Sequence, residues 1–364
     1  MTRITRTPAA DAGFTLIETL IATLLTLFVT GTVLSMANAR SGMAAAQPEM
    51  ADMQQRARAA AAALLDDLLA AGTGTSSGAD AGSLGAFLPP IVPRRMGLSG
   101  ADAPGVVRAD AVTLVWIPDT WKFAATGSAI VPAAPTLSIA PSATCAAGDP
   151  LCGFAAGDDV IVYDDQAHFS AFRLLRTSGS AADLQLHDAG AAFAFSTGAR
   201  VAPVTTHTFY LDSVAHQLRL SDGYATDTPV IDNVVGLNFT YFGDPNPPVA
   251  PKPAPGTANC LYDAAGHPIA GLATLTPSGG SLAPLPLAML NDGPWCGEGG
   301  AQFDADLLRI RRVRVTLRVQ AGPDMFRASG GAFAIPGTSR RADESLPDYV
   351  TTFDVAPRNL APVR

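Results

Sequence analysis

Charged residues are scarce in this chain of 364 residues, where they make up 15% of the sequence and sum to a formal net charge of −8. A chain with this balance has no excess of positive charge to attract phosphate groups, so the composition argues against nucleic-acid binding. Hydrophobic residues reach 48%, and the length suffices for two ordinary domains or one large one. The sequence therefore predicts a protein with a substantial core and no nucleic-acid partner.

Several sequence patterns of catalysis are also missing. H-E-x-x-H, G-x-x-x-x-G-K-[ST] and G-x-G-x-x-G do not occur, and the five histidines are scattered. No serine or threonine stands in a recognisable relation to a base that would activate it. We therefore predict that the protein is not an enzyme and has neither a catalytic residue nor a cofactor.

One long apolar run lies near the N-terminus. Between Phe14 and Ala39 the only charged residue is Glu18, whereas Arg3 and Arg6 precede the run. About 20 apolar residues cross a bilayer, and positive residues ahead of a span favour a cytoplasmic N-terminus. The run therefore predicts a single-pass membrane helix, with the rest of the chain exported.

Two simpler interpretations of this run stay open. Residues 37–39 fit the small-x-small site of a signal peptidase, so an exported adhesin or enzyme would be released after Ala39. The apolar region of a signal peptide, however, spans only about 7 to 15 residues. A plain anchor leaves Glu18 unexplained, because a carboxylate at the bilayer centre costs about 2.5 to 3.5 kcal/mol.

The residues around Glu18 suggest a third interpretation. The segment GFTLIETLIA, from Gly13 to Ala22, closely resembles the processing motif of type IV prepilins and type II secretion pseudopilins. The resemblance implies that a prepilin peptidase cleaves between Gly13 and Phe14 and that Phe14 is N-methylated. Glu18 then becomes the fifth residue of the mature chain and faces the amino terminus of a neighbouring subunit. An ammonium and a carboxylate that meet in a low dielectric offset much of the cost that each carries alone.

The helix should continue beyond the membrane. Between Pro48 and Gly72, apolar residues recur at steps of three and four and so share one helical face. This stripe consists of Met50, Met53, Ala57, Ala60, Leu64, Leu68 and Ala71. Pro48 suits the start or a kink of a helical segment, and Gly72 suits its end. We predict a helix over 14–71 whose second half packs its stripe on the C-terminal part of the chain.

After residue 71 the pattern changes to short alternating runs. Residues 72–110 are rich in Gly, Ala, Ser and Pro, which predicts a connector. β-type runs follow at 111–117, 159–164, 167–175, 183–188, 207–212, 216–221, 234–242, 310–320 and 349–355. In one of them Val313, Val315, Leu317 and Val319 share a face, as in a half-buried antiparallel strand. The predicted fold class is α+β, with a long helix packed on a large antiparallel β-sheet body.

The order of these runs resembles a second family pattern. GDDVIVYDDQAHFSAFRLL, TFYLDSVAHQLRLSDG, VIDNVVGLNFTYFGD, VRVTLRV and FDVAPRNL are similar, in that order, to the body of PilW-like minor pilins, which are related to J-type minor pseudopilins. The resemblance implies a type IV pilin-like fold, with a leader peptide at 1–13, an assembly helix at 14–71 and an exported head at 72–364. Residues 243–301 depart from it, and we expect a Pro- and Gly-rich loop insertion there.

These resemblances imply a minor pilin that joins the tip or priming complex of a type IV pilus and promotes pilus assembly. The expected partners are the prepilin peptidase, other minor and major pilins, the inner-membrane assembly platform and membrane lipid. The chain would first lie in a bacterial inner membrane, with its head in the periplasm, and then in the pilus. A J-type minor pseudopilin of a type II secretion system, with other pseudopilins as partners, stays open as an alternative.

The four cysteines all lie in the part expected to be exported. They are Cys145, Cys152, Cys260 and Cys296. An oxidising compartment favours disulfides, and although four cysteines allow three connectivities, we expect neighbours in sequence to pair. A zinc site is disfavoured because there is no C-x-x-C.

Aspartates flank the run VIVY on both sides. Asp158, Asp159, Asp164 and Asp165 are weak calcium candidates, because the spacing of an EF-hand is absent. Aspartates also favour the turns of hairpins. We therefore expect turn residues here and predict no metal site.

Overall fold

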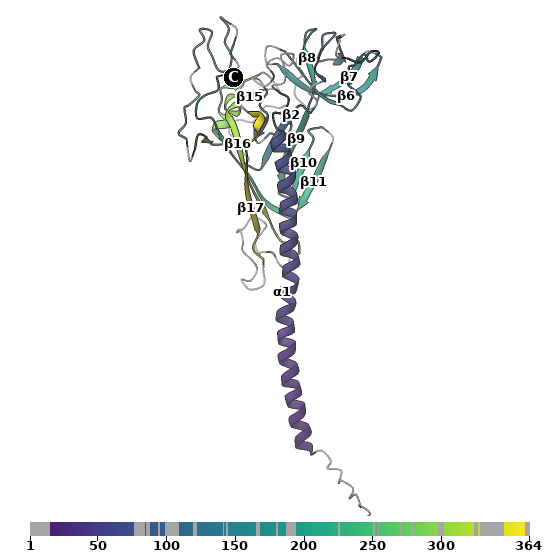
Figure 1. Ribbon diagram of the computed structural model, residues 1–364, viewed down its shortest axis with the longest axis vertical. Coiled ribbons are helices and arrows are strands. Elements are labelled where there is room, and N and C mark those ends of the chain that lie inside the picture. The colour runs from purple at the N-terminus through teal and green to yellow at the C-terminus, as the bar shows by residue number, and fades with distance from the viewer. Residues whose placement is uncertain are drawn as a thin grey trace, which may run out of the picture.

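A single helix dominates the computed structural model of the chain. The structure describes residues 15–75, 84, 88–93, 95–98, 109–118, 122–140, 142, 145–164, 168–179, 181–186, 194–224, 226–249, 252–253, 255–269, 271–277, 280–297, 302–323, 327 and 346–360, with the backbone alone at 36–46, 178 and 186. Helix α1, Leu16–Ala70, has 55 residues and is about 80 Å long. It forms a stalk, and the strands gather around its C-terminal half as a head (Figure 1).

The C-terminal half of α1 packs the predicted apolar stripe into the head. Met53, Ala57, Ala60, Leu64, Leu68 and Ala71 are all buried. The prediction was wrong for Met50, which is 43% exposed. At that level Glu49 faces the head instead and binds the backbone of Gly322, so Met50 lies to the side. The helix also runs through Pro48 without interruption.

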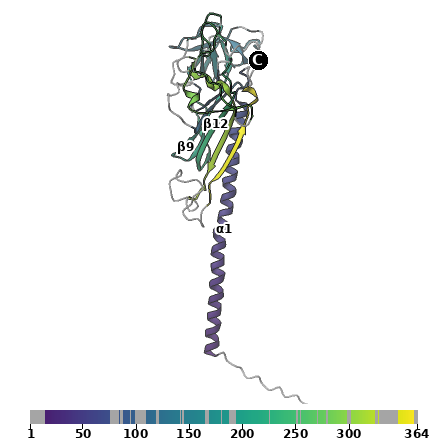
Figure 2. The ribbon, with the colours of Figure 1, turned by 90° about the vertical axis from the view of Figure 1, so that its left-hand side faces the viewer.

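Two antiparallel sheets enclose the main core. The first sheet has the order β1-β2-β9-β10-β11, and the second has the order β13-β12-β16-β17. Their strands are β1 (Ile91–Pro93), β2 (Ala111–Trp116), β9 (Thr205–Asp212), β10 (Gln217–Ser221), β11 (Asp227–Asp232), β12 (Val234–Gly243), β13 (Ala283–Leu285), β16 (Ile310–Val319) and β17 (Tyr349–Val355). Because α1 contacts β2 and β11 of the first sheet and β16 and β17 of the second, it joins the two (Figure 2).

The mixed α+β class is confirmed, and each of the nine predicted β-type runs overlaps a strand. In β16, Val313, Val315, Leu317 and Val319 all point into the core, as their alternation predicts. The connector predicted at 72–110 was wrong in part. Strand β1 lies within it and pairs with β2. This stretch is too short and too rich in proline to show a strand period, yet it packs apolar side chains on the core.

A third sheet forms a separate body, here called the distal module, at residues 122–203. It lies beyond the C-terminal end of α1 (Figure 1). Its order is β3-β8-β5-β6-β7-β4. The strands are β3 (Ala124–Ala125), β4 (Thr136–Ser138), β5 (Asp159–Tyr163), β6 (Phe169–Ser178), β7 (Ala181–Leu186) and β8 (Arg200–Pro203). A bridge between Thr126 and Ile139 joins the first strand to the last, so this sheet closes on itself.

The distal module has its own core but also contributes to the main one. Val160 and Val162 of β5 point into the module, together with Phe172 of β6. The alternate residues Ile161 and Tyr163 pack in the main core. Both faces of β5 are therefore buried, which explains why the run VIVY is continuously apolar.

Residues 244–302 form a long excursion between the neighbouring strands β12 and β16. Besides β13 it contains η3 (Met289–Asn291) and β14 (Trp295–Cys296). It is followed by β15 (Phe303–Asp304) and η5 (Ala305–Arg309), and η7 (Arg358–Leu360) lies near the end of the chain. The buried Arg309 guanidinium donates to the carbonyls of Asp244, Pro245 and Ala273 and pairs with Asp306 at 2.9 Å. One side chain thus ties the excursion to the second sheet.

Candidate functional site: an exposed apolar helix and its junction with the head

The N-terminal half of α1 is apolar around its whole circumference. The segment from Leu16 to Ser35 has a mean hydropathy of 1.9, and none of it is buried against the described chain. Phe28, for example, is 70% exposed. Since apolar surface in water costs about 25 cal/mol per Å², this half of α1 requires an apolar environment. By length and composition it suits one membrane crossing, either as an anchor or as a signal sequence.

The hydroxyl groups in this half of α1 need no water. Thr19, Thr23, Thr26 and Thr30 each donate to a backbone carbonyl three or four residues earlier, at 2.6 to 2.9 Å. Such internal bonds satisfy a hydroxyl group in hydrocarbon. The threonines therefore do not conflict with an apolar environment.

Glu18 closes the start of α1. Thr15 is the N-cap, and its hydroxyl accepts from the Glu18 N–H at 3.3 Å. The Glu18 carboxylate in turn accepts from the Thr15 N–H at 3.3 Å and from its hydroxyl at 3.2 Å. This reciprocal arrangement is a capping box, which the T-x-x-E spacing could have revealed in the sequence. Gly13 and Phe14, the predicted processing residues, lie outside the described residues.

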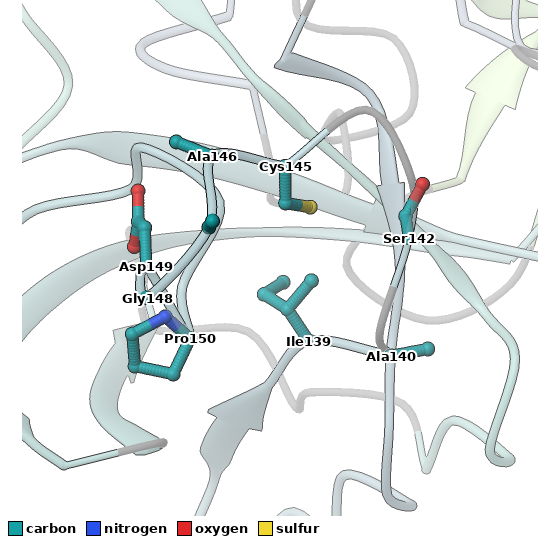
Figure 3. Close-up of a pocket in the computed structure, with 9 residues that line it drawn as sticks. Ile139, Ala140, Ser142, Cys145, Ala146, Gly148, Asp149 and Pro150 are labelled. Carbon is teal, nitrogen blue, oxygen red and sulfur yellow. The ribbon is translucent and has the colours of Figure 1, made fainter.

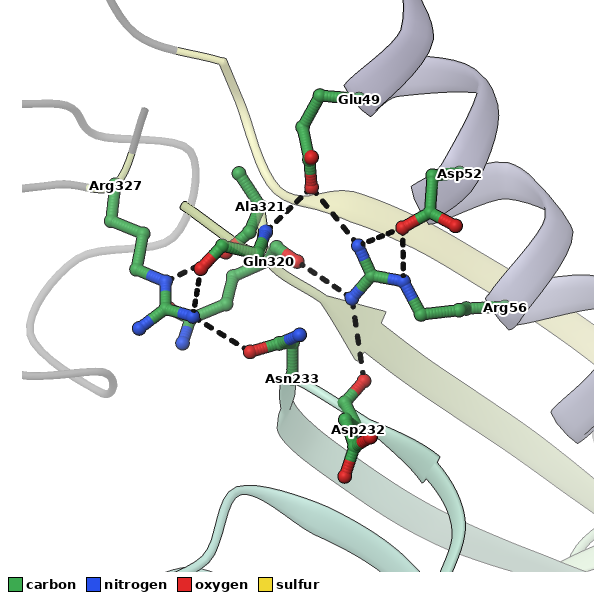
Figure 4. Close-up of polar contacts among 9 residues, drawn as sticks. Glu49, Asp52, Arg56, Asp232, Asn233, Gln320, Ala321 and Arg327 are labelled. Carbon is green, nitrogen blue, oxygen red and sulfur yellow. Dashed lines mark hydrogen bonds and ion pairs between the residues drawn. The ribbon is translucent and has the colours of Figure 1, made fainter. Parts of the chain in front are cut away.

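A cluster of charged residues ties α1 to both sheets where the helix leaves the head (Figure 4). We call it the junction cluster, and Arg56 lies at its centre. The Arg56 guanidinium contacts Glu49 at 3.0 Å and Asp52 at 2.7 Å. It also donates to the carbonyls of Asp232, at the end of β11, and Gln320, after β16, both at 3.4 Å. One helical side chain therefore binds the ends of a strand from each sheet.

The junction cluster is extended on the side of the head. The Glu49 carboxylate accepts from the N–H of Gly322 at 2.5 Å. Arg327 donates to the carbonyl of Ala321 at 2.6 Å and to the side chain of Asn233 at 2.7 Å. Asn233 lies at the corner between β11 and β12 with a φ of 60°, a region that asparagine tolerates better than most residues. Sequence reasoning missed these contacts because they join distant segments and because three of the acceptors, in Asp232, Gln320 and Ala321, are backbone carbonyls.

The upper end of α1 has its own polar contacts. Asp67 binds Nδ1 of His207 on β9 at 2.6 Å, and His207 packs edge-on against Trp116 of β2. The helix then ends at Ala70, and Gly72, which we predicted as its stop, follows with a φ of 76° that favours glycine. An added side chain there would press on Leu360 and its neighbours. The packed half of α1 is thus fixed at both ends.

The four cysteines form two disulfides. Cys145 bonds to Cys152 within the distal module, and Cys260 bonds to Cys296 within the excursion. Both bonds join neighbours in sequence, which is the pairing that we expected. Each closes a loop that has little core of its own. Each disulfide therefore stabilises the fold mainly by lowering the conformational entropy of the unfolded chain, and less by adding packed surface.

The aspartates around β5 do not converge on one point. Asp159 pairs with Arg173 at 2.6 Å, and Asp158 accepts from the N–H of Ala155. Asp164, at the other end of the strand, binds His168. Asp165 lies outside the described residues. Over the described part of the chain, no group of three or more His, Cys, Asp or Glu side chains is placed to hold a metal ion.

A surface pocket of about 490 Å³ lies beside the first disulfide (Figure 3). Its described lining includes Ile139, Ala146 and Pro150, together with Ser142 and Asp149. Both oxygens of Asp149 accept backbone N–H groups of its own loop. Histidine is absent from this described lining.

The sequence contains one match to the G-x-S-x-G pattern, GTSSG at 74–78, which our sequence analysis overlooked. In hydrolases this pattern leads from a strand into a helix. Here it follows the end of α1, and its serine lies outside the described residues. The match therefore supplies no argument for a catalytic serine.

One buried carboxyl group has an unusual pKa. Burial raises the pKa of Asp304 from the ordinary 3.8 to about 6, although backbone N–H groups of Asp306 and Gly293 oppose the shift. The pKa of Asp306 is also raised by burial, against the favourable effect of Arg309. These groups hold the excursion to η5 and lie far along the chain from α1. We assign them a structural role.

Comparison of the chain with known protein families, with curated proteins and with solved structures found no match.

Proposed function

We propose that this chain is a minor pilin: a bacterial inner-membrane protein, processed by a prepilin peptidase, that joins the tip or priming complex of a type IV pilus and promotes its assembly. The observation that carries the proposal is the division of α1. One continuous helix of 55 residues has an apolar half that is wholly exposed and a half that is fixed in a large head. A subunit that leaves the membrane for a filament core needs such a helix, because other subunits' helices must replace lipid around it.

Glu18 has a place in this proposal. Cleavage between Gly13 and Phe14 would create an amino terminus one residue before Thr15, where the helix begins. Among the described residues, the Glu18 carboxylate makes capping bonds of 3.2 to 3.3 Å with Thr15 and no others. An ammonium group from a neighbouring subunit would form a stronger, charge-assisted bond in the same low-dielectric setting. The pairing would also fix the axial position of one subunit against the next.

The size of the head supports a position at the end of the pilus. Two sheets pack along only the upper part of the stalk, and a closed distal module lies beyond its end (Figures 1 and 2). A bulky head caps a filament more easily than it repeats along one. We therefore propose a low-copy subunit whose role is mechanical and not enzymatic.

The decisive test is the mature N-terminus of the full chain, purified from the membranes of its bacterial host and measured by mass spectrometry. The proposal expects a chain that begins with N-methylated Phe14. The matched control is a strain without prepilin peptidase, in which the leader should stay attached. A mature chain that begins at Arg40 would instead identify a signal peptide and refute the proposal.

A J-type minor pseudopilin would use the same helix and head. The two roles differ in what is lost when the chain is absent. Deletion should remove surface pili if the chain is a pilin, and it should block secretion while leaving pili intact if the chain is a pseudopilin. The number of copies per purified filament adds a further test, because a bulk subunit would contradict the position at the tip.

A further inference from the structure

The second sheet turns one face away from α1 and the core. On this face the residues of β16 that alternate with its buried valines are Arg312, Arg314, Thr316 and Arg318. The register places Phe242 of β12 opposite Arg312, and it places Asp354 and Thr352 of β17 opposite Arg314 and Thr316. We call these seven residues the arginine face. Figure 1 shows β16 and β17 on the side of the head away from the β6–β7 hairpin of the distal module.

Two guanidinium groups on this face are held in place before any partner binds. That of Arg312 lies over the Phe242 ring at 4.4 Å, and that of Arg314 lies at 5.2 Å from the same ring. Arg314 also makes a two-pronged pair with Asp354, at 2.6 and 2.9 Å. Such fixed side chains lose little conformational entropy on binding. Both remain accessible, with side-chain exposures of 32% for Arg312 and 44% for Arg314.

The arginine face is positive, although the chain as a whole has a net charge of −8. The carboxylate of Asp354 serves two arginines, since it also lies 3.9 Å from Arg312. Arg318 pairs at 3.5 Å with Asp348, just before β17. Among the described residues, Arg312 and Arg314 therefore share one carboxylate, that of Asp354. The overall composition, which argued against any basic surface, conceals this local excess.

We propose that the arginine face binds an extended, acidic segment of a partner protein. Arg312 and Arg314 are alternate residues of one strand, so they lie about 7 Å apart, which is also the spacing of alternate side chains on an extended segment. A segment with an acid at every second position would place one carboxylate near each guanidinium. The hydroxyls of Thr316 and Thr352 continue the row and can bond a further polar side chain on the same side of the segment as the acids. Arginine and aromatic residues are also enriched in protein interfaces.

A protein partner fits this face better than a nucleic acid or a lipid surface. The carboxylates of Asp354 and Asp348 lie among the arginines and would repel a continuous row of phosphates. The net charge of −8 would weaken the approach of any polyanion. A short segment with spaced carboxylates avoids most of this repulsion. The inference goes beyond the proposed pilin function, since it concerns the head alone and does not depend on cleavage at Gly13.

The test uses the full chain in a non-ionic detergent and a fluorescent peptide of alternating threonine and glutamate. Fluorescence anisotropy should show binding that weakens with salt and that is lost when glutamine replaces the glutamates. In the double variant Arg312→Gln/Arg314→Gln, affinity should fall by about tenfold or more, because two charge-assisted contacts are removed. The matched control is Arg176→Gln on the distal module, an exposed arginine that also pairs with an aspartate, Asp183. It should leave the affinity unchanged.

Three results would overturn the inference. The first is no binding of the peptide at millimolar concentration, and the second is equal binding of the glutamate and glutamine peptides. The third is tighter binding of an oligothymidylate, or of anionic lipid mixed into the micelles, through the same two arginines. Because the glutamine peptide requires no change in the protein, the test stays decisive even if the double variant folds poorly. None of these results bears on the mature N-terminus, so the pilin proposal is tested separately.

Discussion

The two halves of α1 belong to one helix but have opposite designs. From Leu16 to Ser35 every face is apolar apart from Glu18 and the self-bonded hydroxyls, and nothing in the described chain covers it. From Glu49 onward one apolar stripe is buried in the head, and the charged residues lie outside that stripe. A helix that is apolar all round needs an apolar environment on all sides, whereas a striped helix needs a single packed face. The distribution of apolar residues around each half therefore indicates which environment surrounds that half.

The comparison also separates two kinds of anchoring. The C-terminal half of α1 is held in the head by the packing of its apolar stripe and by specific polar contacts, such as those of Arg56 and Asp67. The lower half has no tertiary contacts of this kind within the described chain, so its neighbours can be exchanged without breaking any bond to the head. That difference suits a subunit that moves from lipid into a filament. It can be tested by making matched changes in both halves.

The largest contrast should come from the same substitution made in each half. Leu64→Ala empties a buried site and should lower the free energy of unfolding of the head by about 2 to 5 kcal/mol. Leu24→Ala removes a side chain that is 66% exposed and should change it by less than about 0.5 kcal/mol. Thermal unfolding of the full chain in detergent measures both. Equal effects would mean that the lower half also packs on the head.

A change of pH should act on the head and spare the lower half of α1. The folded head binds the Asp304 proton more tightly than the unfolded chain does, because the pKa is raised from 3.8 to about 6. The free energy of unfolding should therefore fall as the pH rises from about 4 to about 6, by up to about 3 kcal/mol.

Hydrogen exchange measured at several pH values can locate this effect. Protection around residues 292–306 should decrease as the pH rises, whereas protection at 16–35 should not change. Asp304→Asn is the matched variant and should remove most of this pH dependence. If the variant keeps the full dependence, another group is responsible.

The junction cluster should contribute less than the buried stripe. Arg56→Ala removes the partner of Glu49 and the donors to the carbonyls of Asp232 and Gln320. We expect a loss of about 2 kcal/mol in the free energy of unfolding, since the cluster is only partly shielded from water. The control is Arg58→Ala on the exposed side of the same helix, which should cost less than about 0.5 kcal/mol. Chemical denaturation in detergent compares the two variants.

The smallest effect on stability, but a large one on assembly, is expected at Glu18. Glu18→Ala removes half of the capping box and should cost about 0.5 kcal/mol at the first turn, with no effect on the head. Glu18→Gln keeps the capping bonds but removes the charge. If the charge fixes the register of subunits, both variants should be cleaved normally and both should impair piliation, scored by electron microscopy. Normal pili in the glutamine variant would show that only the cap matters.

Much of this architecture could be predicted from the sequence because it depends on local periodicity. The apolar stripe from Met53 to Ala71 indicates which face of α1 is buried, and the alternating valines do the same for β16. The distal module could not be predicted in the same way. Strand β3 has two residues and β4 has three, so neither shows a period, and the bridge that closes the sheet depends on contacts between distant residues.

The candidate site was predictable to a similar extent. Glu18 was identified by its isolation in an apolar run, although its capping partner Thr15 was missed. The junction cluster gave no signal, because the partners of Arg56 include two backbone carbonyls that have no signature in a sequence. Sequence patterns thus identified the features that depend on a single segment. They missed the features that depend on contacts between segments distant in the sequence.

The way in which the distal module joins the head has a consequence for how such a protein can evolve. The chain leaves the first sheet after Trp116 and returns at Thr205, and these two residues pair directly opposite each other. A tight turn could in principle bridge the two ends, so the module behaves as a cassette on an otherwise continuous hairpin. A replacement would have to cover the part of the main core that the module now fills with Ile161, Tyr163, Phe169, Ala171 and Ala202. Lineages could therefore change what the head displays while the helix and its fit to neighbouring subunits stay the same.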